Sequence, residues 1–144
     1  MGASIIGTWQ VLTVTYIMGA DITRIDPALP GLFLFTGSYY SMTWMQQSKP
    51  QEDYSDQWHP TDAEKITSYN SIVTNSGRYK YSDSELTTIV EVAKTPAFVG
   101  GRAVYRCDIT GDEMKLEITD NVAHDGTRDS AYLKFRTLLT LRRL

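Results

Sequence analysis

Cysteine is almost absent from this chain of 144 residues, since Cys107 is the only one. A single cysteine cannot form an intramolecular disulfide, which is compatible with a reducing compartment. The sequence also lacks the charged segment and apolar stretch that open a secretory signal peptide, and no apolar run approaches the ~20 residues of a membrane-spanning helix. We therefore expect a cytoplasmic protein without a membrane partner.

Histidine is equally scarce. The two histidines, His59 and His124, fall in separate expected loops, with no further histidine or cysteine at ligand spacing, so we expect no transition-metal site. No glycine-rich loop precedes a helix, so a nucleotide cofactor has no evident phosphate cradle. The net charge of −3 disfavours a nucleic-acid partner. The expected protein uses neither metal nor cofactor.

Runs of β-branched and aromatic residues dominate what the sequence does contain. The first run, residues 5–16, predicts a strand with Trp9, Val11, Thr13 and Thr15 on one face. Further runs cover residues 31–35, 39–46, 79–81, 86–93, 103–109, 114–118 and 131–144. Because short turns separate most of them, the pattern favours an all-β, up-and-down antiparallel barrel over a parallel sheet. We expect one domain over residues 1–144.

One segment interrupts the β pattern. Thr61 is followed three residues later by Glu64, which is the capping-box arrangement at the start of a helix. Apolar residues then recur at helical spacing, so we predict a short helix over residues 61–73. The polar stretch 48–60 predicts a long surface loop that hangs over one barrel mouth or its side. Residues 48–73 together are expected to form a mobile lid.

Several short motifs are spread along nearly the whole chain. They are Gly7-Thr8-Trp9, residues 31–36 with the hairpin into 39–42, residues 75–79, 96–101 and 106–116, and the closing residues 140–144. With these motifs the sequence resembles the lipocalin-like single-domain proteins of the calycin group. The resemblance implies a small barrel and leaves the function open, because such barrels include carriers and enzymes. It also implies that Arg142 or Arg143 stacks over Trp9, as an arginine does in lipocalins.

Aromatic residues in the expected strands are candidates for substrate binding. Nine tyrosines and three tryptophans could give a barrel interior flat apolar walls with hydroxyl and indole donors. The candidates are Tyr39, Trp44, Tyr79, Tyr81 and Tyr105. The alternative is that about half of them face outwards and that the rest are core packing.

Two charged residues inside expected strands are candidates for catalysis. Alternation places Glu91 on one face with Thr87 and Ile89, and it places Arg106 on one face with Val104. If Glu91 and Arg106 both faced inwards, a desolvated carboxylate beside a guanidinium could polarise a carbonyl or move a proton. The alternative is an ion pair on the outer wall without a function.

Two functions remain open from the sequence. The favoured one is a cofactor-free cyclase, isomerase or lyase of secondary-metabolite-like chemistry, in which the barrel folds an apolar or polyketide-like substrate. The alternative is a non-catalytic carrier of a hydrophobic small molecule. An inward acid or base beside the ligand would favour the enzyme, and an apolar cavity would favour the carrier. A homodimer is left open.

Overall fold

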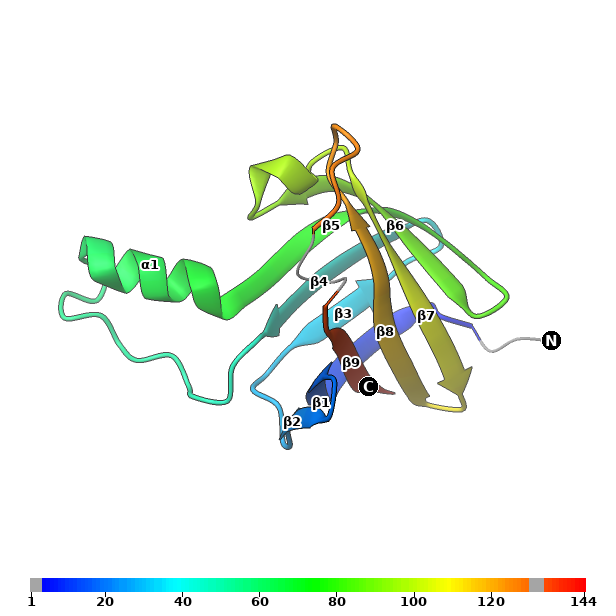
Figure 1. The fold of residues 1–144 in the computed structure, drawn as a ribbon, viewed down its shortest axis with the longest axis horizontal. Coiled ribbons are helices and arrows are strands. Elements are labelled where there is room, and N and C mark those ends of the chain that lie inside the picture. The colour runs from blue at the N-terminus through cyan, green and yellow to red at the C-terminus, as the bar shows by residue number, and fades with distance from the viewer. Residues whose placement is uncertain (1–3, 130–133) are drawn as a thin grey trace.

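The computed structural model describes residues 4–129 and 134–144. In this part of the chain nine strands, one α-helix and one 3-10 helix follow each other (Figure 1). The strands are β1 (Gly7–Met18), β2 (Asp21–Ile25), β3 (Leu32–Phe35), β4 (Tyr39–Met45), β5 (Ile72–Ser82), β6 (Glu85–Ala93), β7 (Arg102–Thr110), β8 (Glu113–Val122) and β9 (Arg136–Arg143). The helices are α1 (Asp62–Ser71) and η1 (Pro96–Phe98). The run expected over residues 131–144 contains β9, but its residues 131–133 lie outside the described part.

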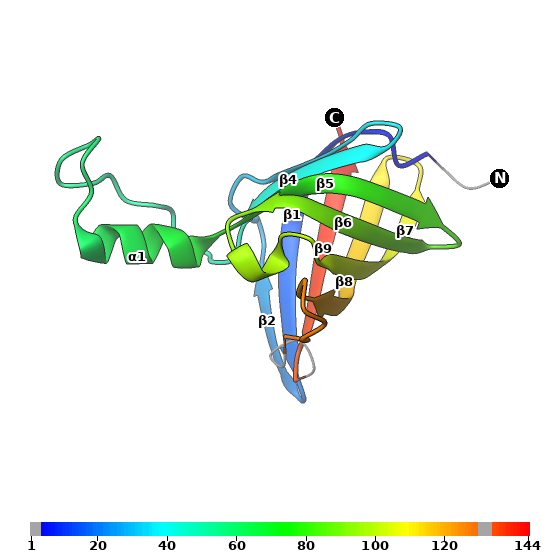
Figure 2. The same ribbon diagram turned by 90° about the horizontal axis from the view of Figure 1, so that it is seen from above.

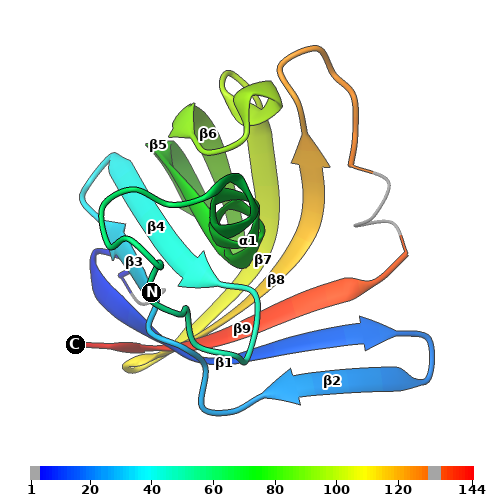
Figure 3. The ribbon, with the colours of Figure 1, turned by 90° about the vertical axis from the view of Figure 1, so that its left-hand side faces the viewer.

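Eight of the strands close into a barrel. Successive strands from β3 to β9 pair antiparallel, and β1 pairs with both β9 and β3, which joins the two ends of the sheet (Figure 3). The remaining strand, β2, pairs with residues 14–18 of β1 and forms a hairpin with them. The predicted up-and-down antiparallel barrel with a short helix is confirmed, whereas β2 was not among the predicted strands.

A β-bulge changes which residues of β1 face the core. Trp9 and Val11 are buried, but the pairing with β9 shifts between Val11 and Thr13, so that Val14 is the next fully buried residue. Thr13 therefore does not share the face of Trp9, and the prediction from strict alternation is wrong here. The Thr13 hydroxyl instead lies 2.5 Å from that of Thr140 on β9.

Trp9 plugs one end of the barrel. Its side chain is fully buried, and its Nε1–H donates to the carbonyl of Ile5 at 2.9 Å. The guanidinium carbon of Arg143 lies 4.3 Å from the centre of the indole. Arg143 also donates hydrogen bonds to the carbonyls of Ser4, at 2.7 Å, and Ile6. The arginine expected over the first-strand tryptophan is thus Arg143.

Between β4 and β5 the chain leaves the barrel as residues 47–71, which we call the arm. Its helix α1 begins with the predicted capping box, in which the Glu64 N–H donates to Thr61 Oγ1 at 3.2 Å and the Thr61 N–H donates to Glu64 Oε1 at 2.8 Å. The helix ends at Ser71, before the predicted end, because residues 72 and 73 already pair with β4. Figures 1 and 2 show α1 extending away from the strands.

Candidate ligand-binding site at the open end of the barrel

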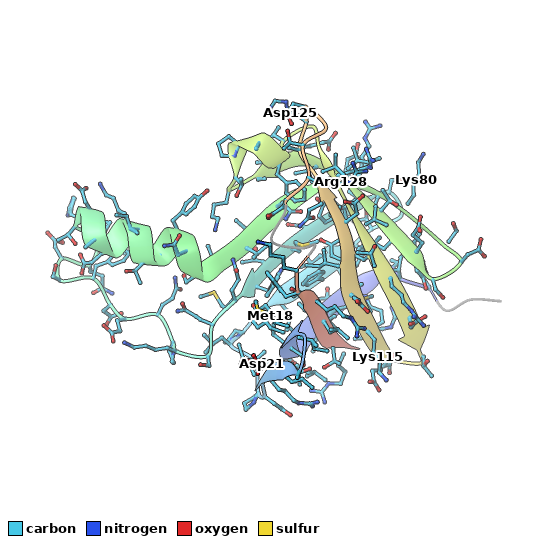
Figure 4. All side chains as sticks on the ribbon, viewed as in Figure 1. Met18, Asp21, Lys80, Lys115, Asp125 and Arg128 are labelled. Atoms are coloured by element: carbon cyan, nitrogen blue, oxygen red, sulfur yellow. The ribbon has the colours of Figure 1, made fainter. Side chains whose placement is uncertain are left out.

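A cavity of about 640 Å³ lies at the end of the barrel opposite Trp9. Segments at the ends of β4, β5, β6 and β8 line it, together with η1 and the loop 123–129. Its apolar surface comes from Val73, Ala93, Phe98, Val122 and neighbouring alanines. Figure 4 shows Asp125 and Arg128 on the loop that borders this end. The volume falls within the range of about 300–1,000 Å³ that is common for small-molecule sites.

A buried hydrogen bond reaches one wall of this cavity. Tyr40 on β4 donates its hydroxyl proton to Oδ1 of Asn75 on β5 at 2.6 Å, and both side chains are buried. Burial raises the pKa of Tyr40 to about 12, so this hydroxyl stays protonated at neutral pH. Asn75 itself lines the cavity, and within the described residues its side-chain N–H groups have no hydrogen-bond partner. Asn75 therefore offers a positioned donor to a molecule in the cavity.

Charged side chains along the cavity mostly have partners within the protein. Arg128 Nε lies 3.2 Å from the carboxylate of Asp120. Asp125 accepts hydrogen bonds from the hydroxyl and the backbone N–H of Thr127, and these bonds hold the pKa of Asp125 below its ordinary value. Lys94 differs from both, because none of the described carboxylates forms an ion pair with its ammonium group.

The five aromatic residues predicted to bind substrate do not belong to the described lining of this cavity. Tyr39 faces outwards and is 49% exposed. Trp44 and Tyr105 are buried in the core, while Tyr79 and Tyr81 are half-buried and pack against it. Four of the five thus pack in or against the core.

Glu91 and Arg106, the predicted catalytic pair, lie on the outer wall. The Glu91 side chain is 51% exposed and lies 3.6 Å from the guanidinium of Arg78, whereas the Arg106 side chain is 69% exposed and lies 3.1 Å from Asp108. The expectation that both face inwards is wrong, because alternation gives the inner face of β6 to residues such as Val90. The two residues neither pair with each other nor line the cavity.

Asn75 was missed by the sequence analysis as a site residue. Its motif, residues 75–79, gives no indication of which side of β5 it faces. The register does, because Asn75 stands directly opposite Met42, a buried residue of β4. Directly opposite residues of antiparallel strands share a face of the sheet. Asn75 could have been identified from the sequence if the run 39–46 had been paired with the stretch that follows the helix.

Three further features concern metal binding, membrane spanning and the single cysteine. Among residues 4–129 and 134–144 no cluster of histidine, cysteine, aspartate and glutamate could hold a metal ion. In the same residues no helix has the length and apolarity to cross a membrane. Cys107 is fully buried, and burial raises its pKa to about 12, so its thiol is not activated as a nucleophile.

Comparison with known proteins places this barrel in a family. No curated protein matches the sequence. A crystal structure of an uncharacterized protein from Bacteroides eggerthii is 12% identical, with a TM-score of 0.48 over 98% of this chain and 100% of that chain. The model of a family described as a lipocalin-like domain matches residues 6–143, which include every strand of the closed barrel. The chain therefore belongs to the lipocalin-like domain family.

Proposed function

We propose that the cavity at the open end binds a mostly apolar small molecule that carries a hydrogen-bond acceptor, such as a carbonyl oxygen. The observation that carries this proposal is Asn75, which is only 4% exposed and lines the cavity. Its oxygen is already occupied by Tyr40, and its N–H groups have no partner among the described residues. These N–H groups are accessible from the cavity, so an acceptor atom of a ligand can replace water there, and such a hydrogen bond contributes about 0.5–1.5 kcal/mol.

The apolar lining defines the rest of the ligand. Val73, Ala93, Phe98 and Val122 offer contact surface without charge, and burial of apolar area is the main source of affinity in such sites. A hydrophobic or polyketide-like molecule with a carbonyl group satisfies both the lining and Asn75. The proposed activity is non-covalent binding, as in a carrier.

Catalysis has weaker support than binding. A cofactor-free cyclase, isomerase or lyase needs an acid or a base at the reacting atoms. Glu91 and Arg106 lie outside the barrel, and Tyr40, with a pKa of about 12, does not accept a proton at neutral pH. The carboxylates that do line the cavity, Asp125 and Asp129, are exposed to solvent and not desolvated beside a bound ligand. We therefore propose the carrier, and the experiments below separate it from the enzyme.

The binding proposal is tested with prodan, a fluorescent apolar ketone. Titration of the protein with prodan should give a saturable, blue-shifted emission, and Asn75→Leu should weaken binding about 5–10-fold through loss of one hydrogen bond. Ala93→Trp, which fills the cavity, should weaken binding further. Ser76→Ala is the matched control, because Ser76 follows Asn75 on β5 and its hydroxyl pairs with Ser41 at 2.7 Å on the outer face. Absence of saturation, or full binding by both cavity variants, would reject the proposal.

Turnover is tested with a linear triketone that can lose one water to form a cyclic pyranone. A carrier should return the triketone unchanged, with formation of the pyranone no faster than in buffer. An increase in that rate that Ala93→Trp abolishes would instead support the enzyme.

A further inference from the structure

Lys94 connects the cavity to the arm. It follows the last residue of β6, lines the cavity and is half-buried. Its backbone N–H donates to the carbonyl of Thr74 on β5 at 3.2 Å, which fixes the start of its side chain. Its ammonium group donates to the carbonyl of Ile72 at 2.5 Å and to that of Tyr69, and it lies 4.1 Å from the centre of the Tyr69 ring. One side chain thus touches both the proposed ligand site and the end of α1.

The partners of this ammonium group are dipoles and not carboxylates. Carbonyls at the C-terminus of a helix attract a cation, but they do not neutralise its charge. Arg128, the other cation of the described lining, is paired with Asp120. Of the two cations in the described lining, Lys94 is therefore the one whose ammonium group forms no ion pair with a described carboxylate.

An anion in the cavity would compete with α1 for Lys94. The present contacts join the charged ammonium group to carbonyl dipoles, whereas a contact with an anion joins two full opposite charges and is therefore stronger at the same distance. The carbonyls at the C-terminus of α1 carry partial negative charge, so an anion beside them would also repel this end of the helix. Both effects favour separation of Lys94 from the helix when an anionic ligand binds.

We propose that Lys94 exchanges partners: it holds the carbonyls of Tyr69 and Ile72, where α1 meets β5, in the empty barrel and pairs with an anionic head group of the ligand in the occupied one. This rests on the proposed binding function and narrows the ligand to an apolar molecule with an acidic group. Release of Lys94 loosens α1, while the Gln46 N–H still donates to the carbonyl of Ser71 at 3.0 Å and keeps the arm attached to the barrel.

Two fluorescent probes with the same aromatic body test the charge preference on the full chain. They are 1-anilinonaphthalene-8-sulfonate, which is anionic, and N-phenyl-1-naphthylamine, which is neutral. The unmodified protein should bind the anionic probe about tenfold more tightly, and Lys94→Met should abolish this preference while it keeps binding of the neutral probe. Lys115→Met is the control, since Lys115 is exposed on β8 and lies away from the open end (Figure 4).

Amide hydrogen exchange in α1 tests the exchange of partners. The anionic probe should speed exchange of the helix amides several-fold, and the neutral probe should leave it unchanged. Lys94→Met should exchange fast with or without a probe. Lys94→Gln, which keeps a hydrogen-bond donor but removes the charge, should keep slower exchange than Lys94→Met and still lose the preference for the anionic probe.

The outcomes distinguish this inference from the binding function. If neither probe binds in a saturable way, the proposed function fails. If the neutral probe binds but Lys94→Met leaves the preference between probes unchanged, only the role of Lys94 fails. A preference that depends on Lys94 together with unchanged exchange in α1 would overturn the exchange of partners.

Discussion

Arg143 and Trp9 stand directly opposite each other on β9 and β1, and the guanidinium covers the indole at 4.3 Å. This contact accounts for the glycine that precedes Trp9 by two residues. Gly7 has a φ of +142°, a conformation that side chains disfavour, and a Cβ there would come within 3.0 Å of Arg143 Nη1. The Gly-x-Trp motif and the C-terminal arginine are thus parts of one packing arrangement.

Truncation of the indole should destabilise the barrel strongly. Trp9→Ala removes a fully buried aromatic side chain at the closed end, and it should cost about 3–5 kcal/mol of unfolding free energy in a urea titration. Trp58→Ala is the matched control, because Trp58 is 85% exposed on the arm and should change stability by less than about 0.5 kcal/mol. A loss below about 1 kcal/mol for Trp9→Ala would contradict its role as a plug.

Arg143 should not be replaceable by lysine. Arg143→Lys keeps the charge but loses the planar fork that stacks on Trp9 and reaches the carbonyls of Ser4 and Ile6, so we expect a loss of about 1–2 kcal/mol. Arg142→Lys changes its exposed neighbour in the same way and should be nearly neutral. Equal unfolding midpoints for the two variants would show that the stacking contributes nothing.

The capping box should stabilise the arm locally and leave the barrel unaffected. Thr61→Ala removes the side-chain acceptor for the Glu64 N–H and should cost about 1 kcal/mol of helix stability, seen as faster amide exchange in α1. Exchange in β6 to β8 should remain unchanged, because α1 extends away from those strands. Thr67→Ala is the control, because it makes the same change within the same helix but leaves the capping box intact. Faster exchange throughout the barrel would contradict the independence of the arm.

The Glu117–Arg136 pair should contribute to stability only above acidic pH. Two hydrogen bonds from Arg136, at 2.7 and 2.8 Å, hold the pKa of Glu117 below its ordinary value. A lowered folded-state pKa means that the stabilisation is complete above the unfolded pKa of about 4.3 and is lost as the pH falls through the folded value. The difference in urea midpoint between the unmodified protein and Glu117→Gln should therefore shrink from pH 7 towards pH 2. A difference in urea midpoint that grows as the pH falls would contradict the predicted contribution of this pair.

The barrel could be predicted because alternation and turns are local properties of the sequence. Most strands, the capping box of Thr61 and Glu64, and the arginine over Trp9 follow from patterns within a few residues or from the family resemblance. The choice of the inner face was harder, because alternation groups Glu91 with Ile89 but does not say whether this face meets the core. The bulge between Val11 and Thr13 reverses a face midway through β1, and nothing in the local sequence marks it.

The ligand site could not be predicted because it depends on register and on a long excursion of the chain. Asn75 faces the cavity because β5 pairs with β4, and these two strands are separated in the sequence by the whole arm. The contacts of Lys94 with the carbonyls of Tyr69 and Ile72 are likewise visible only in the folded chain. Of the aromatic residues that suggested a ligand-lined interior, Tyr39 faces outwards, and the other four pack in or against the core. Residue type was therefore a poor guide to the site, and strand pairing would have been a better one.

The arm begins and ends at hydrogen-bonded neighbours, which makes it a removable module. Met45 and Ile72 are opposite each other in the β4–β5 ladder, and the Gln46 N–H donates to the Ser71 carbonyl just beyond them. A two-residue turn could therefore join these strands directly, as in an ordinary β-hairpin. Lengthening, shortening or exchanging residues 47–70 of the arm changes the entropy of one surface connection and leaves the hydrogen bonds between β4 and β5 in place. Diversity at the open end can thus arise by insertion and deletion, independently of the sequence that encodes the closed end.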